Sequence, residues 1–177
     1  MSEEIQLVIR QASGEDSAQL LALSQQVAKE TDYLIMDEYG MGLSEELLAE
    51  QLDLLAQADN QLLLLAFDGT QCIGAASIKG NDEYRIHHIG EVGIFILKEY
   101  WSLGISSLLM EELIEYVKQV QIFKRLELTV QTRNQKAIAL YQKFGFSKEA
   151  TLKYGARLDN GDFVDVDLMA RYFEVGE

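Results

Sequence analysis

A glycine-containing turn between a strand and a helix is the first feature of this sequence that could bind a ligand. An apolar strand ends near Leu97, a short turn follows, and an amphipathic helix begins at Gly104. The start of a helix offers unpaired backbone N–H groups and the positive end of the helix dipole, so it can hold a phosphate or pyrophosphate. A glycine in the turn lets such a group approach the backbone. The alternative is an ordinary helix start with one glycine in its turn. The candidate contacts are Trp101, Ser102, Leu103, Gly104, Ile105, Ser106 and Ser107.

Further side chains carry groups that could bind a ligand or move a proton. Asn134 precedes a short predicted helix, where its amide can cap the helix or bond a peptide-like ligand. Tyr141 lies on that helix and is either a core aromatic residue or a proton donor. Glu91 begins a strand and is either a solvated carboxylate or a base. His87 and His88 lie just before it and could relay a proton, although paired histidines at a strand end are more often structural.

The elements that position these residues are apolar strands and amphipathic helices in alternation. Alternating apolar residues predict a strand around residues 5–9, Ser13–Asp16 is a capping pattern before a first helix, and Ser44 caps a second. The other predicted elements are strands over 61–67, 71–78, 85–97, 126–130, 146–157 and 163–169, and helices over 104–120 and 134–144. This order is strand, two helices, three strands, helix, strand, helix and two strands. It predicts an α/β fold with a mixed central sheet of about six to seven strands and helices on both faces.

Local signals add detail to the strands. Asp68–Gly69 and Asn160–Gly161 are hairpin signals, and the second predicts a two-residue turn between the last two strands. In the last strand, apolar residues alternate with Asp165 and Asp167, which predicts one buried and one solvated face. Gly93 within its strand indicates a bulge or a close backbone approach.

The segment from Asn134 to Phe146 closely resembles a signature of the GNAT superfamily of acyl-CoA-dependent N-acetyltransferases, Asn-x-x-Ala-x-x-Leu-Tyr-x-Lys-x-Gly-Phe. The matching residues are Asn134, Ala137, Leu140, Tyr141, Lys143, Gly145 and Phe146. The turn at 101–106 resembles the pyrophosphate-binding pattern of the same family, Gln/Arg-x-x-Gly-x-Gly/Ala. Gly104 matches, whereas Trp101 stands where glutamine or arginine is usual and Ser106 stands where glycine or alanine is usual.

The resemblance implies an enzyme that transfers an acetyl group from acetyl-CoA to a primary amine by direct attack in a ternary complex. It implies Tyr141 as the general acid that protonates the departing thiolate, and a backbone N–H at Ile94 or Phe95 as the donor to the thioester carbonyl. In members resembling phosphinothricin N-acetyltransferases, a glutamate at the position of Glu91 is the proposed base. Other branches place one at the position of Thr129, which cannot serve, and water or a histidine is the alternative. The implied cofactor contacts are Ile94, Phe95, Ile96, the turn 101–107, Asn134 and Lys143.

Composition sets limits on the class of protein. The 177 residues, 48% apolar and 25% charged, fit one globular domain over 1–177. A net charge of −14 argues against a nucleic-acid partner. The longest purely apolar run, Leu62–Phe67, is too short to cross a bilayer, and the acidic N-terminus shows no secretory signal. The single cysteine, Cys72, is expected to be a small buried residue and fits a reducing cytoplasm, and with two adjacent histidines it gives no metal-ligand spacing. We therefore expect a cytoplasmic protein without a metal or a membrane partner. Because dimers are common in the GNAT family, a homodimer is the expected oligomeric state.

The charge distribution bears on the acceptor. Residues 1–70 carry 14 acids and two bases, a net of −12, whereas residues 71–177 carry 15 acids and 13 bases, a net of −2. The connection from Thr31 to Leu43 is long, and in the GNAT family it lies on the acceptor side. Its candidate acceptor contacts are Tyr33, Met36, Asp37, Glu38, Tyr39 and Met41. We expect a small cationic primary amine as acceptor. The alternative for the acidic residues is that they are merely solvated. The alternatives for the function are an acyl-CoA-binding regulatory module without catalysis, or an interaction domain without a ligand.

Overall fold

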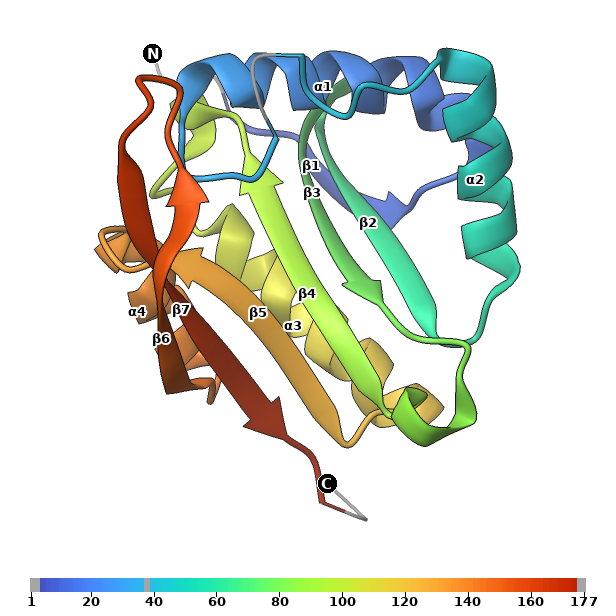
Figure 1. Ribbon diagram of the computed structural model, residues 1–177. Coiled ribbons are helices and arrows are strands. Elements are labelled where there is room, and N and C mark those ends of the chain that lie inside the picture. Colours follow the sequence, from blue (N-terminus) through green and yellow to red (C-terminus); the bar gives the residue numbers. More distant parts are fainter. Residues whose placement is uncertain (1–3, 37–38, 175–177) are drawn as a thin grey trace.

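A computed structural model describes residues 4–36 and 39–174, which form a seven-stranded mixed sheet with α-helices on both faces (Figure 1). The strand order in the sheet is β1-β2-β3-β4-β5-β7-β6. The strands are β1 Leu7–Gln11, β2 Gln61–Asp68, β3 Gln71–Lys79, β4 Ile89–Ile96, β5 Arg125–Gln131, β6 Ser147–Arg157 and β7 Phe163–Tyr172. The α-helices are α1 Ser17–Glu30, α2 Glu45–Gln57, α3 Ile105–Val120 and α4 Gln135–Lys143. The predicted fold class and element order are confirmed.

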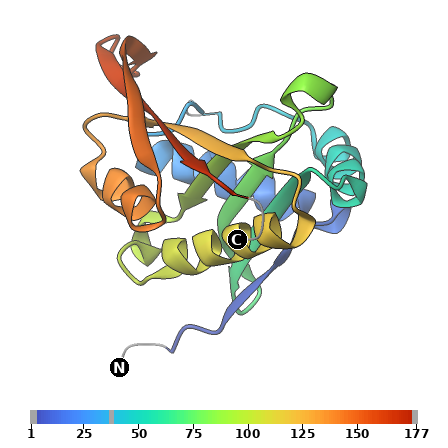
Figure 2. The same cartoon turned by 90° about the horizontal axis from the view of Figure 1, so that it is seen from below.

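The helices divide the sheet into a front face, on which α1 and α2 lie, and a back face, on which α3 and α4 lie (Figures 1 and 2). Leu109, Met110 and Leu113 of α3 are fully buried in the core. The helices α1 and α2 lie over β1–β3, so the front of β4 and β5 has no helix over it (Figure 1). Glu91 and Thr129 are accordingly exposed there. This part of the front face is therefore open to solvent.

The two central strands separate partway along their length. β4 and β5 are parallel and pair only from Ile89 opposite Arg125 to Glu91 opposite Glu127. Beyond these pairs β4 runs on to Ile96 and β5 to Gln131 without pairing to each other. We call the space between the two unpaired ends the β4–β5 gap. Its backbone groups lack the ladder partners that a continuous sheet would supply.

One expectation for the central strand is wrong, and another is narrowed to one of its alternatives. The strand predicted over 85–97 begins only at Ile89, because a short 3-10 turn occupies Tyr84–Ile86. Of the two alternatives for Gly93, the bulge is absent, since the pairing of β4 with β3 runs without a shift from Ile96 opposite Gly74 to Glu91 opposite Lys79. The other alternative, a close approach, fits the structure, because a Cβ at Gly93 would lie 3.1 Å from Ser77 Oγ. The central strands part because their pairing ends, and no extra residue is inserted.

The last hairpin also differs from its prediction. The N–H of Leu158 donates to the carbonyl of Asp162 at 2.8 Å and that of Gly161 to Leu158 at 2.9 Å, so the loop has three residues, 159–161. Gly161 has φ +92°, as expected for the last position of a three-residue loop. The predicted alternation in β7 fails at Asp167, which is 4% exposed. Thr132 and Thr151 donate hydroxyl hydrogen bonds to Asp167 Oδ1 at 3.1 and 2.7 Å, which makes its burial possible.

Within the residues that the structure describes, no helix is both long and apolar enough to span a membrane.

Candidate active site

The β4–β5 gap exposes a defined set of backbone groups. Arg125 N–H donates to the carbonyl of His88, which therefore faces β5, whereas Leu97 N–H donates to Ile73 of β3. Because successive N–H groups of a strand point to opposite sides, even-numbered residues of β4 face β5. Ile94 lies beyond the last β4–β5 pair, so its N–H faces the gap, while that of Phe95 faces β3. Of the two N–H groups predicted as donors to a thioester carbonyl, that of Ile94 is the one that faces the gap.

The turn before α3 presents backbone N–H groups to open space. Gly104 is the N-cap of α3 at φ +83°, and a Cβ built on it would meet no atom within 4 Å. The first backbone bond of the helix runs from Leu108 N–H to the carbonyl of Gly104 at 3.2 Å. The N–H groups of residues 105–107 therefore have no acceptor within the helix and can serve an anion.

Trp101 has a role that the resemblance did not assign. Its indole Nε1–H donates to the carbonyl of Ile96 at 2.8 Å. This bond ties the turn to the end of β4 and occupies a carbonyl that faces the gap. The tryptophan at the usual glutamine or arginine position thus contributes to the shape of the turn.

Two lysines of α4 face this turn. Lys143 Nζ donates to Ser107 Oγ at 3.3 Å, and Lys136 Nζ donates to Ser102 Oγ at 2.8 Å. Lys143 was predicted as a contact, whereas Lys136 was missed. It lies seven residues before Lys143 on the same face of the helix, a spacing that could have revealed it. Two ammonium groups beside a helix N-terminus are an arrangement that can hold an anion.

These features fit coenzyme A. Its phosphates match the open space over Gly104, the free N–H groups of α3 and the two lysines, and its amide-containing arm matches the unpaired backbone of the gap. Among the described residues, no cluster of three or more histidine, cysteine or acidic side chains could hold a metal ion.

Tyr141 combines a buried ring with a hydroxyl that has no hydrogen-bond partner among the described residues. The residue is 7% exposed, and its ring packs edge-on against Phe146 with 6.0 Å between centroids. Since no fully buried polar side-chain atom in the described part lacks a partner, the hydroxyl must reach accessible space. Burial raises the pKa of Tyr141 to about 12, so the hydroxyl is protonated at neutral pH and can donate.

Asn134 is the N-cap of α4. Its Oδ1 accepts a hydrogen bond from Ala137 N–H at 3.3 Å. The same amide keeps an NH₂ group that can donate to a ligand. The helix-capping alternative is therefore observed, and it leaves the ligand-binding alternative open.

Glu91 lies on the open front face where the β4–β5 gap begins. It lines a small polar cavity of about 180 Å³ together with Lys79, Gly80, Asn81, Ile89 and Glu127. Ile94 lies three positions after Glu91, which corresponds to about 10 Å along a strand. A proton from an amine beside Ile94 would reach this carboxylate through intervening water.

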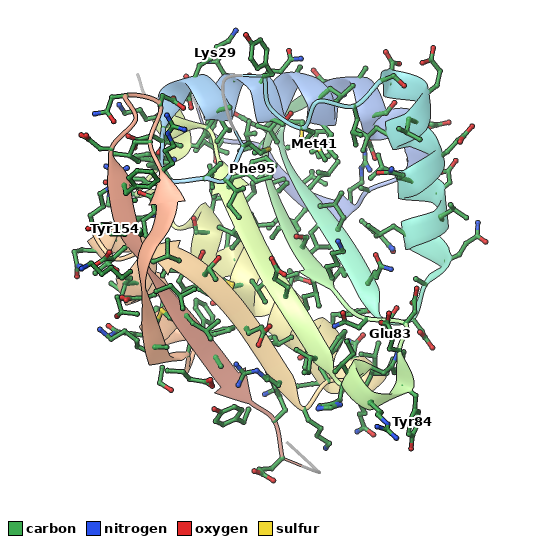
Figure 3. All side chains as sticks on the ribbon, in the orientation of Figure 1. Lys29, Met41, Glu83, Tyr84, Phe95 and Tyr154 are labelled. Carbon is green, nitrogen blue, oxygen red and sulfur yellow. The ribbon has the colours of Figure 1, made fainter. Side chains whose placement is uncertain are left out.

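The histidines lie away from the gap. His87 Nδ1 is 2.8 Å from the carbonyl of Asn81, near the end of β4 where pairing with β5 begins. Figure 3 shows Glu83 and Tyr84, just before this pair, at the opposite end of the sheet from Phe95. Neither histidine is brought to Tyr141 or to the turn at Gly104 by these contacts.

Cys72 is buried, as expected, at 6% exposure. Burial raises the pKa of its thiol to about 11, which disfavours the reactive thiolate at neutral pH.

A cavity of about 380 Å³ lies where the segment after α1 meets the turn before α3. It is lined by Ala28, Lys29, Glu30, Thr31, Asp32, Tyr33, Lys98, Trp101 and Asp159. Both signs of charge are present, so the wall is less uniformly acidic than the charge of the N-terminal half indicated. Met41 packs against the hydrophobic core, and Tyr39 is 70% exposed. Asp37 and Glu38 lie outside the described residues.

Comparisons with known proteins match this geometry. Residues 28–146 match the family model described as the Acetyltransferase (GNAT) family. The chain belongs to the GNAT acetyltransferase family. A structure described as an acetyltransferase of the GNAT family from Streptococcus pneumoniae is 42% identical, with a TM-score of 0.93 over 95% of this chain and 100% of that one.

Two further similar proteins differ in how much they show. The L-amino acid N-acetyltransferase AaaT of Escherichia coli is 37% identical over 109 residues, which span 62% of this chain and 66% of that protein. The putative acetyltransferase yncA of Salmonella typhimurium, solved with its cofactor acetyl-CoA, is 15% identical with a TM-score of 0.79 over 96% of this chain and 95% of that one. At that identity the second likeness shows the fold alone. The expected superfamily and its N-acetyltransferase class are confirmed.

Proposed function

We propose that this protein transfers an acetyl group from acetyl-CoA to a small primary amine by direct attack in a ternary complex. Three features support the proposal: the unpaired backbone of the β4–β5 gap, the open space over Gly104 at the start of α3, and the protonated hydroxyl of Tyr141. Acetyl-CoA supplies the thioester when it is bound. A regulatory module would need only the anion-binding turn, so Tyr141 favours the enzyme.

The chain's own residues divide the work. Lys136, Lys143 and the N–H groups of α3 bind phosphates, while Asn134 bonds the amide-containing arm. Ile94 N–H donates to the oxygen that gains negative charge, which stabilises the transition state. Glu91 takes the proton of the ammonium through water, and Tyr141 donates its proton to the departing sulfur. Holding amine and thioester in near-attack geometry supplies much of the remaining acceleration.

The acceptor remains the small cationic amine that the sequence predicts, with net charge −12 over residues 1–70 attracting it. An L-amino acid is the second candidate. The relative named for L-amino acids and the presence of Lys29 and Lys98 beside acidic groups in the larger cavity favour it, because a zwitterion needs both signs of charge.

Free-thiol release from acetyl-CoA with polyamines, amino acids and neutral amines, at two ionic strengths, tests these proposals. A cationic acceptor predicts that kcat/KM falls with salt, whereas a zwitterionic acceptor predicts weak salt dependence. Coenzyme A binding in calorimetry without acetylation of any amine would instead identify a regulatory module.

A further inference from the structure

Four residues tie the segment after α1 to the end of β5. Asp32 and Tyr33 follow α1, while Gln131 ends β5 and Arg133 lies two residues later. We call these four residues the clasp. Figure 1 shows the segment after α1 crossing in front of the sheet near the upper ends of β4 and β6. The clasp therefore joins parts of the chain about 100 residues apart in sequence.

Each clasp residue contacts at least one other at short distance. Gln131, 5% exposed, donates from Nε2 to the backbone carbonyl of Asp32 at 2.7 Å. Its Oε1 accepts from Arg133 Nε at 2.8 Å. Arg133 Nη2 pairs with Asp32 Oδ1 at 2.6 Å, and the guanidinium lies 4.7 Å from the centroid of the Tyr33 ring.

The geometry needs an arginine. One guanidinium bonds a side-chain amide and a carboxylate through two different nitrogens while its plane lies near a ring, which the point charge of a lysine cannot reproduce. Arg133 also neutralises Asp32, so that carboxylate is already paired and serves to hold the segment.

The clasp lies between the two substrate sides of the proposed site. Asp32 and Tyr33 line the larger cavity together with Trp101 of the turn before α3. Arg133 directly precedes Asn134, the N-cap of α4, and Asn134 N–H donates to the carbonyl of Gln131 at 2.8 Å. The connection between β5 and α4, which carries the proposed cofactor contact Asn134, therefore restrains the Asp32–Tyr33 wall of the cavity.

We propose that Arg133 is a positioning residue that fixes the Asp32–Tyr33 wall of the larger cavity, taken here as the place of the acceptor, before the amine binds. This inference rests on the proposed function for its meaning but makes a structural claim of its own. With the wall already ordered, the amine does not bear the entropic cost of ordering it. Loss of the clasp should therefore weaken amine binding and leave acetyl-CoA binding intact.

The test uses Arg133→Met, Arg133→Lys, Asp32→Asn and the Asp32→Asn/Arg133→Met double variant. In Arg133→Met we expect KM for the amine to rise about tenfold, an effect within the range of measured couplings between neighbouring residues. We expect kcat and the dissociation constant of coenzyme A to change less than about twofold. Arg133→Lys should recover little, and the double variant should be no worse than Arg133→Met alone. Additive effects of the two single changes would overturn the clasp as a unit.

Arg10→Met is the matched control. Arg10 also pairs with an aspartate, Asp16, at 2.7 Å and also lies over a ring, 4.5 Å from the centroid of Phe67, but it is on β1. It should lower stability without changing KM for the amine. A rise in KM equal to that of Arg133→Met would mean that general destabilisation explains the effect, and would overturn the proposal.

Amide hydrogen exchange of residues 31–36 gives a readout independent of activity. Exchange there should accelerate in Arg133→Met, but not in Arg10→Met, with and without coenzyme A. Unchanged exchange would overturn the clasp even in an active enzyme. If the unsubstituted protein acetylates no amine, the proposed function fails, and the exchange result still decides whether Arg133 orders this segment.

Discussion

At the scale of single residues, Tyr141 shows how burial fits a side chain for a task. The ring is held in the core while the hydroxyl reaches accessible space and has no hydrogen-bond partner in the part of the chain that the structure describes. Burial raises its pKa to about 12, so the group stays protonated over the range in which enzymes work. A thiolate leaving group with an ordinary thiol pKa near 8.5 is a weaker base than a tyrosinate of that pKa, so full transfer would be uphill. Assistance is therefore expected as partial transfer in the transition state.

Tyr141→Phe should lower kcat by about 10²–10³-fold and leave the affinity for coenzyme A within about twofold, because only a proton donor is lost. Because the raised pKa keeps the hydroxyl protonated below about pH 11, the substitution should not change any alkaline limb of the pH profile below that value. Single-turnover kinetics and calorimetry measure the two quantities. A kcat close to that of the unsubstituted enzyme, with chemistry rate-limiting, would leave Tyr141 as a packing residue.

Glu91→Gln should remove the acid limb of the kcat/KM profile if this carboxylate accepts the proton of the amine. Glutamine has nearly the same size as glutamate, but its amide cannot act as a base. The control is Glu127→Gln, which changes the carboxylate opposite Glu91, one already paired with Arg125 at 2.7 Å. A profile that is the same in Glu91→Gln and in the unsubstituted enzyme would assign the role to water.

At the scale of elements, the turn before α3 depends on backbone that a side chain would obstruct. Gly104→Val places a branched side chain at φ +83° in the open space that the phosphates are proposed to fill. We expect coenzyme A affinity to fall at least about tenfold, together with a loss of stability of about 1–2 kcal/mol from the left-handed backbone.

Gly69→Val separates these two effects. Gly69 has φ +55°, and a Cβ added to it would also meet no atom within 4 Å, but it lies in the β2–β3 hairpin. It should show the same kind of stability loss with unchanged coenzyme A affinity. Equal loss of affinity in both variants, measured by calorimetry on folded protein, would argue against a phosphate cradle at Gly104.

Most elements could be predicted because their signals are local. Ser44 accepts a hydrogen bond from Leu47 N–H as the N-cap of α2, just as its position before a helical pattern predicts. The apolar run at 61–67 becomes β2, which extends to Asp68. Such patterns depend only on residues that are close together in the sequence.

Two failures are local, the length of the loop at 159–161 and the start of β4, whereas the others concern partners far apart in sequence. Asp167 is buried because threonines of the β5–α4 connection and of β6 converge on it, and no local pattern reveals that meeting. Lys136 is a candidate phosphate contact because it bonds Ser102, which lies 34 residues earlier in the sequence. The gap itself arises where the β4–β5 pairing stops, a property of two strands that neither strand's sequence specifies.

At the scale of the whole molecule, acid stability should depend on Asp16. This carboxylate is buried, and hydrogen bonds from the Arg10 guanidinium and the Ser13 N–H hold its pKa below the ordinary value, with the Arg10 bond the larger cause. Because the folded-state pKa is lowered, the pair contributes stability above about pH 4 that is lost as pH falls through the folded-state pKa.

Asp16→Asn should reduce the free energy of unfolding by about 1–3 kcal/mol at pH 7, since it removes a charged acceptor. The difference from the unsubstituted protein should shrink as pH falls below about 4 towards the lowered folded-state pKa of Asp16, because the unfolded chain binds the proton first. Urea unfolding at pH 7, 5 and 3 measures it. Asp53→Asn, which alters an exposed carboxylate that accepts from Gly14 N–H at 2.8 Å, should show a smaller effect, and a pH-independent deficit in Asp16→Asn would contradict the assignment.

The irregular pairing of β6 has a consequence for colloidal behaviour. β6 is an outermost strand of 11 residues, and such an edge is a template on which other chains can add strands and aggregate. Its register with β7 shifts between Leu152 and Ala156, and Tyr154 within that stretch has φ +55°. Tyr154 N–H, which a flat edge could offer to a neighbouring molecule, instead donates to Asp165 Oδ1 at 3.0 Å. The kink at Tyr154 shortens the straight part of the β6 edge, and Lys148 and Lys153 place positive charge along it. Both features oppose the addition of strands from other molecules to this long edge strand.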